Sequence, residues 1–381
     1  MPRRLLTAAL VVAALTMTSC AAPGPAPEPT GLAPLGAATP SPTPSSSMPA
    51  APLPALAPTG ELGVLASGLR APWSIVPLAT GSVFLSERDT ARIVELSPEG
   101  RISVVGTVPG VVPGGEGGLL GLAALDEGTP YLYAYYTAAA DNRIVRLPVT
   151  GTPGQYRLGA PEVLLAGIPK ARTHNGGRLA FGPDGMLYAT TGDAQQTARA
   201  QDPGSLAGKI LRIAPDGGVP ADNPTPGSYV YSLGHRNPQG IAFDADGQLW
   251  AAEFGQNTWD ELNRIVPGAN YGWPVVEGAD GAGGFRDPVQ QWATSEASPS
   301  GIAIVEGTLF MTGLRGQRLW SIDLANPGGS RPHFVERLGR IRDAVATPDG
   351  RLLIVTNNTD GRGDPGPDDD RLIVVELAPR G

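Results

Sequence analysis

Residues 172–193 read RTHNGGRLAFGPDGMLYATTGD, and this stretch shows the unit from which the chain is built. A polar segment with His174 comes first, and a short apolar run, a Pro-Asp-Gly turn and a second apolar run follow. Glycine tolerates a positive φ, so Asp184-Gly185 is typical of a tight hairpin between two strands. The stretch therefore predicts a β-hairpin with polar residues just ahead of its first strand.

The same order of features returns along the chain. The repeats begin near Trp73, Leu120, Leu179, Ile241, Ile302 and Ala344. A later strand rich in Ile, Leu and Val follows in each repeat, for example residues 209–213. Internal repeats of turn-separated strands at this spacing are typical of a β-propeller. We therefore predict an all-β fold, a six-bladed β-propeller; a β-sandwich or two smaller barrels would not need the recurrence.

Composition agrees with this class. The 52 glycines and 40 prolines among 381 residues favour many turns and short strands over long helices. Charged residues make up only 17% and the net charge is −8, which argues against a nucleic-acid partner. The single cysteine, Cys20, rules out an intramolecular disulfide framework.

The N-terminus has the features of an export signal. Arg3 and Arg4 precede the apolar run 5–17, which is short for a membrane span. Cys20 follows Met17-Thr18-Ser19, which resembles a bacterial lipobox. We expect residues 1–20 to be a lipoprotein signal peptide and Cys20 to be lipidated; ordinary cleavage near Ala21 is the alternative.

Residues 21–60 are dominated by Ala, Pro, Ser, Thr and Gly. Such a segment cannot bury enough apolar surface to offset the entropy of ordering, so we predict a disordered tether. The propeller is then expected at residues 61–381. The protein would be exported and held at the outer face of the cell membrane through its N-terminal lipid only.

A propeller makes a spatial prediction about the polar residues ahead of each repeat. The first strand of every blade lines the central channel, so these residues should meet at one mouth of it. They are Glu116, His174, Arg236, Asn237, Ser298, Ser300, Arg340 and Arg342. A carboxylate, an imidazole, an amide and three guanidinium groups together predict a site for a polyanionic ligand with a general base beside it.

Several motifs in this order resemble one protein family. They are residues 114–121 (GGEGGLLG), 172–193, 234–240 (GHRNPQG), 253–261 (EFGQNTWDE), 270–274 (NYGWP) and 339–343 (GRIRD). Residues 64–378 thereby resemble the soluble quinoprotein glucose/sorbosone (aldose sugar) dehydrogenase family. The resemblance implies a six-bladed propeller that carries pyrroloquinoline quinone (PQQ) and calcium.

The resemblance also implies roles for individual residues. His174 matches the general base that removes the proton of the sugar C1 hydroxyl, a task that suits an imidazole. Arg236 and Asn237 match residues that hold the quinone oxygens. Arg340 and Arg342 match residues that bind the cofactor carboxylates, for which a guanidinium is well shaped.

The calcium sites are implied in the same way. The backbone carbonyls of Gly255 and Gln256 match ligands of the calcium on the cofactor, a hard cation that takes oxygen donors. Glu261 and Tyr271 resemble part of a second, structural calcium site. Asp260 and Glu261 could equally form a solvated turn.

Four positions depart from the family pattern. Gln256 replaces a proline, which matters little if only its carbonyl is used. Glu116 stands where a glutamine is usual, near the expected substrate. Thr173 replaces an aspartate of the glucose-oxidising members. Arg315 takes the place of a cofactor-binding lysine. These departures bear on substrate identity more than on the fold.

Other polar and aromatic residues have plainer interpretations. His235 and His333 are expected to be structural. Arg342 could instead pair with Asp343 or Asp349. The loop 360–370 could bind calcium or be a solvated loop. The tryptophans Trp73, Trp250, Trp273 and Trp320 are expected to pack within blades.

The function predicted from these residues is PQQ-dependent oxidation of the anomeric carbon of an aldose to the lactone. The electrons would leave to an acceptor that the sequence does not name. A non-catalytic sugar- or ligand-binding propeller is the first alternative, because the fold by itself implies no chemistry. A calcium-dependent lactonase is the second.

Overall fold

The structure is a computed structural model that describes residues 54–125, 131–281 and 283–380. The predicted signal peptide, Cys20 and the tether up to residue 53 lie outside these residues. Within the described ranges, no helix is long and apolar enough to cross a membrane.

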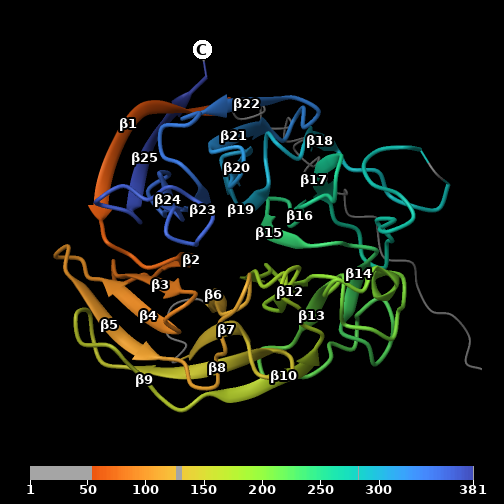
Figure 1. Ribbon diagram of the computed structural model, residues 1–381, viewed down its shortest axis with the longest axis horizontal. Helices are drawn as coiled ribbons and strands as arrows, with labels where there is room; N and C mark the ends of the chain where they lie inside the picture. The colour runs from red at the N-terminus through yellow and green to blue at the C-terminus, as the bar shows by residue number, and fades with distance from the viewer. Residues whose placement is uncertain (1–53, 126–130, 282, 381) are drawn as a thin grey trace, which may run out of the picture. The chain divides into compact units, whose positions relative to one another are not determined.

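Six antiparallel sheets form a ring, and each sheet is one blade (Figure 1). Blade 1 contains β2 (Pro72–Pro77), β3 (Val83–Glu87), β4 (Arg92–Leu96) and β5 (Ile102–Thr107). Blade 2 contains β6 (Leu119–Ala124), β7 (Tyr131–Thr137), β8 (Asn142–Thr150), β9 (Arg157–Leu158) and β10 (Glu162–Ile168). Blade 3 contains β11 (Leu179–Phe181), β12 (Leu187–Thr191), β13 (Lys209–Ile213) and β14 (Val230–Leu233).

The remaining blades have the same plan. Blade 4 contains β15 (Pro238–Phe243), β16 (Leu249–Glu253), β17 (Trp259–Arg264) and β18 (Gln290–Ala293). Blade 5 contains β19 (Pro299–Val305), β20 (Thr308–Gly313), β21 (Arg318–Asp323) and β22 (Ser330–His333). Blade 6 contains β23 (Ile341–Ala346), β24 (Leu352–Thr356), β25 (Leu372–Pro379) and β1 (Leu56–Ala66).

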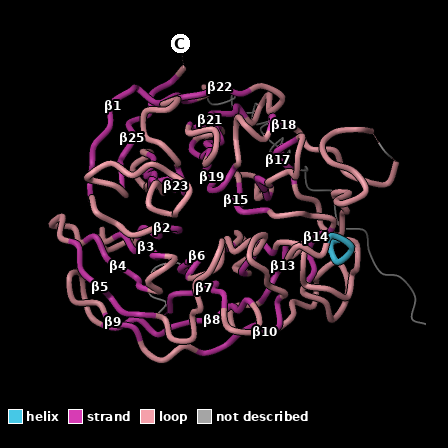
Figure 2. Tube along the Cα trace, viewed as in Figure 1, coloured by secondary structure: helices cyan, strands magenta, loops and turns pink. Residues whose placement is uncertain are grey.

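Strands and loops account for almost all of the described chain. Its single helical turn is the 3-10 helix η1 (Thr197–Ala200), between β12 and β13 (Figure 2). Each of the six predicted repeats begins within three residues of the first residue of an inner strand (β2, β6, β11, β15, β19 or β23). The predicted six-bladed propeller is therefore confirmed.

The Asp-Gly turns connect first and second strands as predicted. Gly185, Gly247 and Gly350 have φ of 73°, 78° and 80°, a backbone region that residues with a Cβ rarely adopt. These hairpins pair β11 with β12, β15 with β16 and β23 with β24.

The ring is closed by a strand from the beginning of the chain. Strand β1 pairs antiparallel with β25, from Leu56 opposite Pro379 to Ala66 opposite Leu372. The first strand of the propeller therefore starts at Leu56, a few residues before the boundary expected at residue 61. The buried Leu56 packs into the core of blades 5 and 6, a contact that the Ala- and Pro-rich composition around it conceals.

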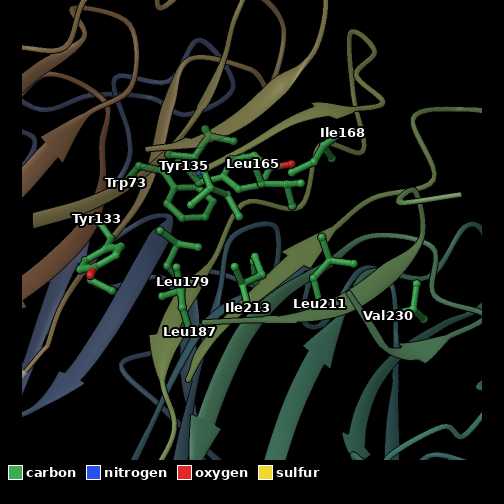
Figure 3. Packing of buried hydrophobic residues seen from close by; sticks show 14 residues of the cluster. Trp73, Tyr133, Tyr135, Leu165, Ile168, Leu179, Leu187, Leu211, Ile213 and Val230 are labelled. Carbon is green, nitrogen blue, oxygen red and sulfur yellow. The ribbon is translucent and has the colours of Figure 1, made fainter. Parts of the chain in front are cut away.

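The core lies between neighbouring blades. One cluster joins Trp73 of blade 1 and Tyr135 of blade 2 to Leu179, Leu187 and Leu211 of blade 3 (Figure 3). Because such contacts hold each blade against the next, the inner strands keep fixed positions around the channel. The loops at their ends can then carry polar residues that meet in space.

Candidate active site

Five of the predicted residues come together at one cavity. Glu116 precedes β6, Ser298 precedes β19, Arg315 follows β20, Arg340 precedes β23, and Arg342 lies in β23. They line a cavity of about 230 Å³. Blades 2, 5 and 6, distant in sequence, thus supply one site.

This cavity carries an excess of positive charge. Its lining includes five arginines and two carboxylates, namely Arg88, Arg315, Arg340, Arg342, Arg362, Glu116 and Asp360. The buried Asp360 accepts hydrogen bonds from two of them, at 3.0 Å from Arg340 Nη2 and 3.4 Å from Arg342 Nη2. One carboxylate therefore serves two buried guanidinium groups.

The pKa of Arg342 reflects its burial among these positive charges. Burial lowers its pKa to about 9; Asp360 opposes the shift, whereas Arg340 and Arg88 add to it. The alternative pairings of Arg342 are not seen, because Asp343 pairs with Arg178 at 2.8 Å and Asp349 pairs with Arg351 at 2.7 Å.

The loop 360–370 is only partly solvated. Asp364 and Asp368 are exposed, but Asp360 and Asp370 are buried. Asp370 accepts hydrogen bonds from Thr356 and from the residues that follow β24. Both buried carboxylates are therefore engaged within the protein, and a fully solvated loop does not describe them.

His174 forms a dyad with a buried carboxylate. Its Nδ1 lies 2.8 Å from Oδ1 of Asp193, whose Oδ2 accepts a hydrogen bond of 2.9 Å from Trp273 Nε1. Burial alone would raise the pKa of Asp193, but the contacts with His174 and Trp273 outweigh it and leave the pKa lowered. An ionised carboxylate only accepts hydrogen bonds, so Nδ1 carries the proton and Nε2 presents a lone pair.

The backbone conformation of residue His174 positions its imidazole. His174 has φ of 60°, and its N–H donates to Oε2 of Glu116 at 3.0 Å. A Cβ on Gly192 would collide with the His174 carbonyl, so the approach of these two segments requires glycine. Nε2 has no hydrogen-bond partner among residues 54–125, 131–281 and 283–380, and the side chain is 18% exposed.

Arg236 and Asn237 are near the dyad but do not line the cavity of about 230 Å³. Asn237 is buried, and its Oδ1 accepts a hydrogen bond of 3.0 Å from Gly176 N. Arg236 Nη1 donates to the carbonyls of Gly255 (2.7 Å) and Phe254 (3.3 Å), and its guanidinium lies 5.5 Å from the ring centroid of Trp273. Its Nε is buried without a hydrogen-bond partner in the described part of the chain.

The residues predicted to bind calcium lie beside Arg236. Gly255 and Gln256 are in the loop between β16 and β17, where a Cβ on Gly255 would collide with the Trp259 carbonyl. Glu261 and Tyr271 line a second cavity of about 10 Å³, together with Glu253. That volume is about the size of one water molecule or ion.

Burial disfavours the ionised form of Glu261, one of the acidic groups of this second cavity. Burial raises the pKa of Glu261 to about 8, and the neighbouring Glu253 adds to the shift. The Tyr271 hydroxyl donates to the Arg264 carbonyl, so only the backbone of Tyr271 is free to face a cation. No three acidic, histidine or cysteine side chains gather into a metal cluster within the residues described, so any cation here needs carbonyl oxygens as well.

The two other histidines have structural partners. His235 is fully buried between Glu253 (2.7 Å) and Ser232 (2.8 Å), and His333 contacts Ser321 (2.8 Å). Thr173 is half-buried next to His174 and does not line the cavity of about 230 Å³.

Two of the four tryptophans do more than pack within a blade. Trp73 lines the cavity of about 230 Å³ and lies under the guanidinium groups of Arg178 (4.1 Å) and Arg342 (5.9 Å). Trp273 Nε1 donates to Asp193. Trp250 of blade 4 and Trp320 of blade 5 serve packing, in one hydrophobic cluster between these two blades.

Sequence reasoning missed a group of site residues with a common position. They follow the second strand of a blade and are Arg88, Asp193, Phe254, Asp360 and Arg362. The second strand of a hairpin ends beside the start of the first strand. The hairpin pattern alone could therefore have predicted that residues just after the second strand lie at the same site.

This chain is similar to several known proteins. Residues 69–372 match the sequence profile of the glucose/sorbosone dehydrogenase family. The solved PQQ-bound aldose sugar dehydrogenase of Streptomyces coelicolor is 49% identical, with a TM-score of 0.80 over 84% of this chain and 100% of that one.

Two further relatives match over part of their length. Quinoprotein glucose dehydrogenase B of Acinetobacter calcoaceticus is 35% identical over 257 residues, which are 58% of this chain and 54% of that protein. The aldose sugar dehydrogenase of Escherichia coli is 32% identical over 225 residues, 51% of this chain and 60% of that protein. The profile match extends over most of the propeller, and the chain therefore belongs to the glucose/sorbosone dehydrogenase family.

Proposed function

We propose that this protein oxidises the C1 hydroxyl of an aldose to the lactone, with PQQ as its redox cofactor. The observation that carries the proposal is the His174–Asp193 dyad beside an arginine-lined cavity. Membership of the family, and the likeness to a PQQ-bound aldose sugar dehydrogenase, support it.

The cavity fits a cofactor with three carboxylates. Its lining has five guanidinium groups against two carboxylates, which is an excess of three positive charges. The lowered pKa of Arg342 indicates buried positive charge that the protein itself does not neutralise. When bound, PQQ supplies the quinone that accepts the hydride from the sugar.

His174 then acts as the general base. Its Nε2 takes the proton of the C1 hydroxyl as the C1 hydride leaves, and a carbonyl forms at C1. Asp193 holds Nδ1–H and stabilises the imidazolium that results. Arg236, whose Nε is unpaired, and Asn237 would stabilise negative charge that develops near the dyad.

Calcium binding fits the loop at Gly255. The carbonyls of Phe254 and Gly255 already face a cation, the Arg236 guanidinium, and carbonyl oxygens are ligands that calcium accepts. We assign Gly255 and Gln256 to calcium beside the cofactor, and Glu261 with the Tyr271 backbone to a second calcium.

The remaining roles concern substrate and location. Glu116 and Thr173 are the residues we assign to the sugar; Glu116 contacts both His174 N and Arg362 (2.9 Å), so it couples the base to the rim of the cavity. The electron acceptor is expected to be an external redox partner. Lipidation at Cys20 would hold the protein at the outer face of the membrane, which the mass of the mature N-terminal peptide tests.

Reconstitution tests the activity. The purified protein is mixed with PQQ and calcium, and dye reduction is measured with a panel of aldoses. Replacement of His174 by Ala should lower kcat by about 100-fold or more, the range of general base catalysis, while PQQ still binds. His333→Ala, which removes a histidine outside the site, is the matched control and should keep full activity.

Two outcomes would contradict the proposal. Binding of PQQ without turnover of any aldose would indicate a ligand-binding propeller. Full turnover by the His174→Ala variant would remove the proposed base.

A further inference from the structure

Glu277 gathers an unusual set of hydrogen bonds. It lies between β17 and β18, and its Oε1 accepts the N–H groups of four consecutive residues, three in the loop between β16 and β17 and the fourth at the start of β17. The distances from Oε1 are 2.6 Å to Gln256 N, 3.0 Å to Asn257 N, 3.1 Å to Thr258 N and 3.3 Å to Trp259 N.

These bonds determine where the carbonyls of the loop point. In a trans peptide unit, the C=O of one residue and the N–H of the next point in opposite directions. The unit that carries Gln256 N–H also carries the Gly255 carbonyl, and the unit with Asn257 N–H carries the Gln256 carbonyl. When Glu277 takes both N–H groups, both carbonyls turn away from it.

The observed contacts agree with this direction. The Gly255 carbonyl meets Arg236 Nη1 at 2.7 Å, on the side away from Glu277. Asp260 does the same for the preceding unit: its Oδ1 accepts Gly255 N at 2.9 Å, and the Phe254 carbonyl faces Arg236. The carboxylates of Glu277 and Asp260, behind the loop, therefore direct the carbonyls of Phe254 and Gly255 toward the Arg236 guanidinium.

We propose that Glu277 is a positioning residue that orients the carbonyls of Gly255 and Gln256 toward calcium. The inference rests on the proposed function, because it concerns the cation that those carbonyls would hold. In this role Glu277 acts through the peptide units of the loop, whose N–H groups it accepts, and not as a ligand of the cation.

Glu277 supports the loop from behind. Its four hydrogen bonds hold the peptide units whose carbonyls would face the cation, as a group behind a metal ligand holds that ligand in position. Such supporting groups commonly change metal affinity about 10- to 100-fold when they are removed.

Calcium affinity, measured without substrate, is the test. The metal-free protein is incubated with PQQ, and calcium is titrated while the absorbance of bound PQQ is recorded. Glu277→Ala, which removes the acceptor, should raise the half-saturating calcium concentration about tenfold or more. Glu277→Gln keeps an oxygen at the same reach and should stay within about threefold of the wild type.

A further variant and a control separate orientation from other effects. Glu277→Asp keeps the charge but is too short to reach all four N–H groups, so it should weaken calcium binding as Glu277→Ala does. Glu296→Ala removes an exposed carboxylate in the loop between β18 and β19 and should change nothing. Melting temperatures in EDTA show whether a variant is folded.

The results that overturn the inference are distinct from those that overturn the function. If Glu277→Ala or Glu277→Asp binds calcium like the wild type, Glu277 does not position the loop. If Glu277→Gln is as weak as Glu277→Ala, charge and not orientation matters, and the inference fails. If the wild type itself shows no calcium-dependent binding of PQQ, the proposed function fails first.

Discussion

At the scale of single residues, the chemistry depends on which nitrogen of His174 carries a proton. Asp193 is the only carboxylate in contact with Nδ1 in the described part of the chain, and it is fully buried. A buried, ionised acceptor leaves no choice of tautomer. The lone pair on Nε2, which the proposed proton transfer needs, is thus a consequence of Asp193.

Replacement of Asp193 by Asn tests this dependence. The amide can donate to Nδ1 and so place the proton on Nε2, the wrong tautomer for a base. We expect kcat to fall about 100- to 10,000-fold, while the absorbance of bound PQQ is unchanged. Asp184→Asn, in a hairpin turn of the same blade, is the control and should retain activity. Retention of wild-type kcat by Asp193→Asn would contradict the assigned tautomer.

Glu261 gives a prediction about pH. Its pKa in the folded protein is about 8, raised from an ordinary value of 4.5, so the folded state holds a proton that the unfolded state releases between these values. The free energy of unfolding of the metal-free protein should therefore fall as pH rises through this window. The melting temperature in EDTA should drop by several degrees between about pH 5 and pH 8.

Two comparisons isolate this effect. Glu261→Gln has no proton to release, so its melting temperature should depend less on pH than that of the wild type. At the proposed calcium site, the cation would take the place of the proton, so the stabilising effect of calcium should grow with pH up to about 8. Parallel pH profiles of the wild type and Glu261→Gln would show that Glu261 does not titrate in this range.

At the scale of elements, the inner hairpins explain what the sequence could and could not predict. Strand starts were predictable because each apolar run follows a polar segment and precedes a glycine turn. Residues before the first strand, such as Glu116 and Arg340, were therefore placed correctly. Site residues that follow the second strand were missed. They lie at the same end of the blade, because the second strand of each hairpin runs back beside the first, as Pro238 opposite Glu253 shows.

Outer strands were harder to predict for a different reason. The run β5 has exposed and half-buried residues at five of its six positions, so it lacks the apolar pattern of an inner strand. Strand β22 contains a proline and no buried residue. Pairing with the neighbouring strand, and not hydrophobic periodicity, makes these segments β-structure.

The contacts around Glu277 were beyond prediction in a similar way. Its four acceptor bonds depend on the path of a loop, which no repeat or motif specifies. Asp360 is another case: it looked solvated in an acidic, Gly- and Pro-rich segment, yet two buried arginines surround it. Such groups are found only when the fold places charges side by side.

At the scale of the whole molecule, the site depends on closure of the ring. Blade 6 contributes Arg340, Arg342 and Asp360, and it meets blade 1 through specific bonds. Asn357 Nδ2 donates to the Pro72 carbonyl at 2.9 Å, and Arg88 Nη2 donates to the Asp360 carbonyl at 3.2 Å. Strand β1 completes blade 6, so a segment far from the cavity supports its geometry.

Truncation of β1 tests this dependence. A protein that begins at residue 67 leaves β25 with an unpaired edge and removes the buried Leu56 from its core. We expect its melting temperature to fall by about 10 °C or more and its affinity for PQQ to weaken, measured by thermal unfolding and by spectral titration. A protein that begins at residue 54 keeps β1 and is the matched control; its melting temperature should match that of the full chain. Equal stability of the two truncated proteins would show that the ring closes without β1, because the bonds between blades 6 and 1 would then be sufficient.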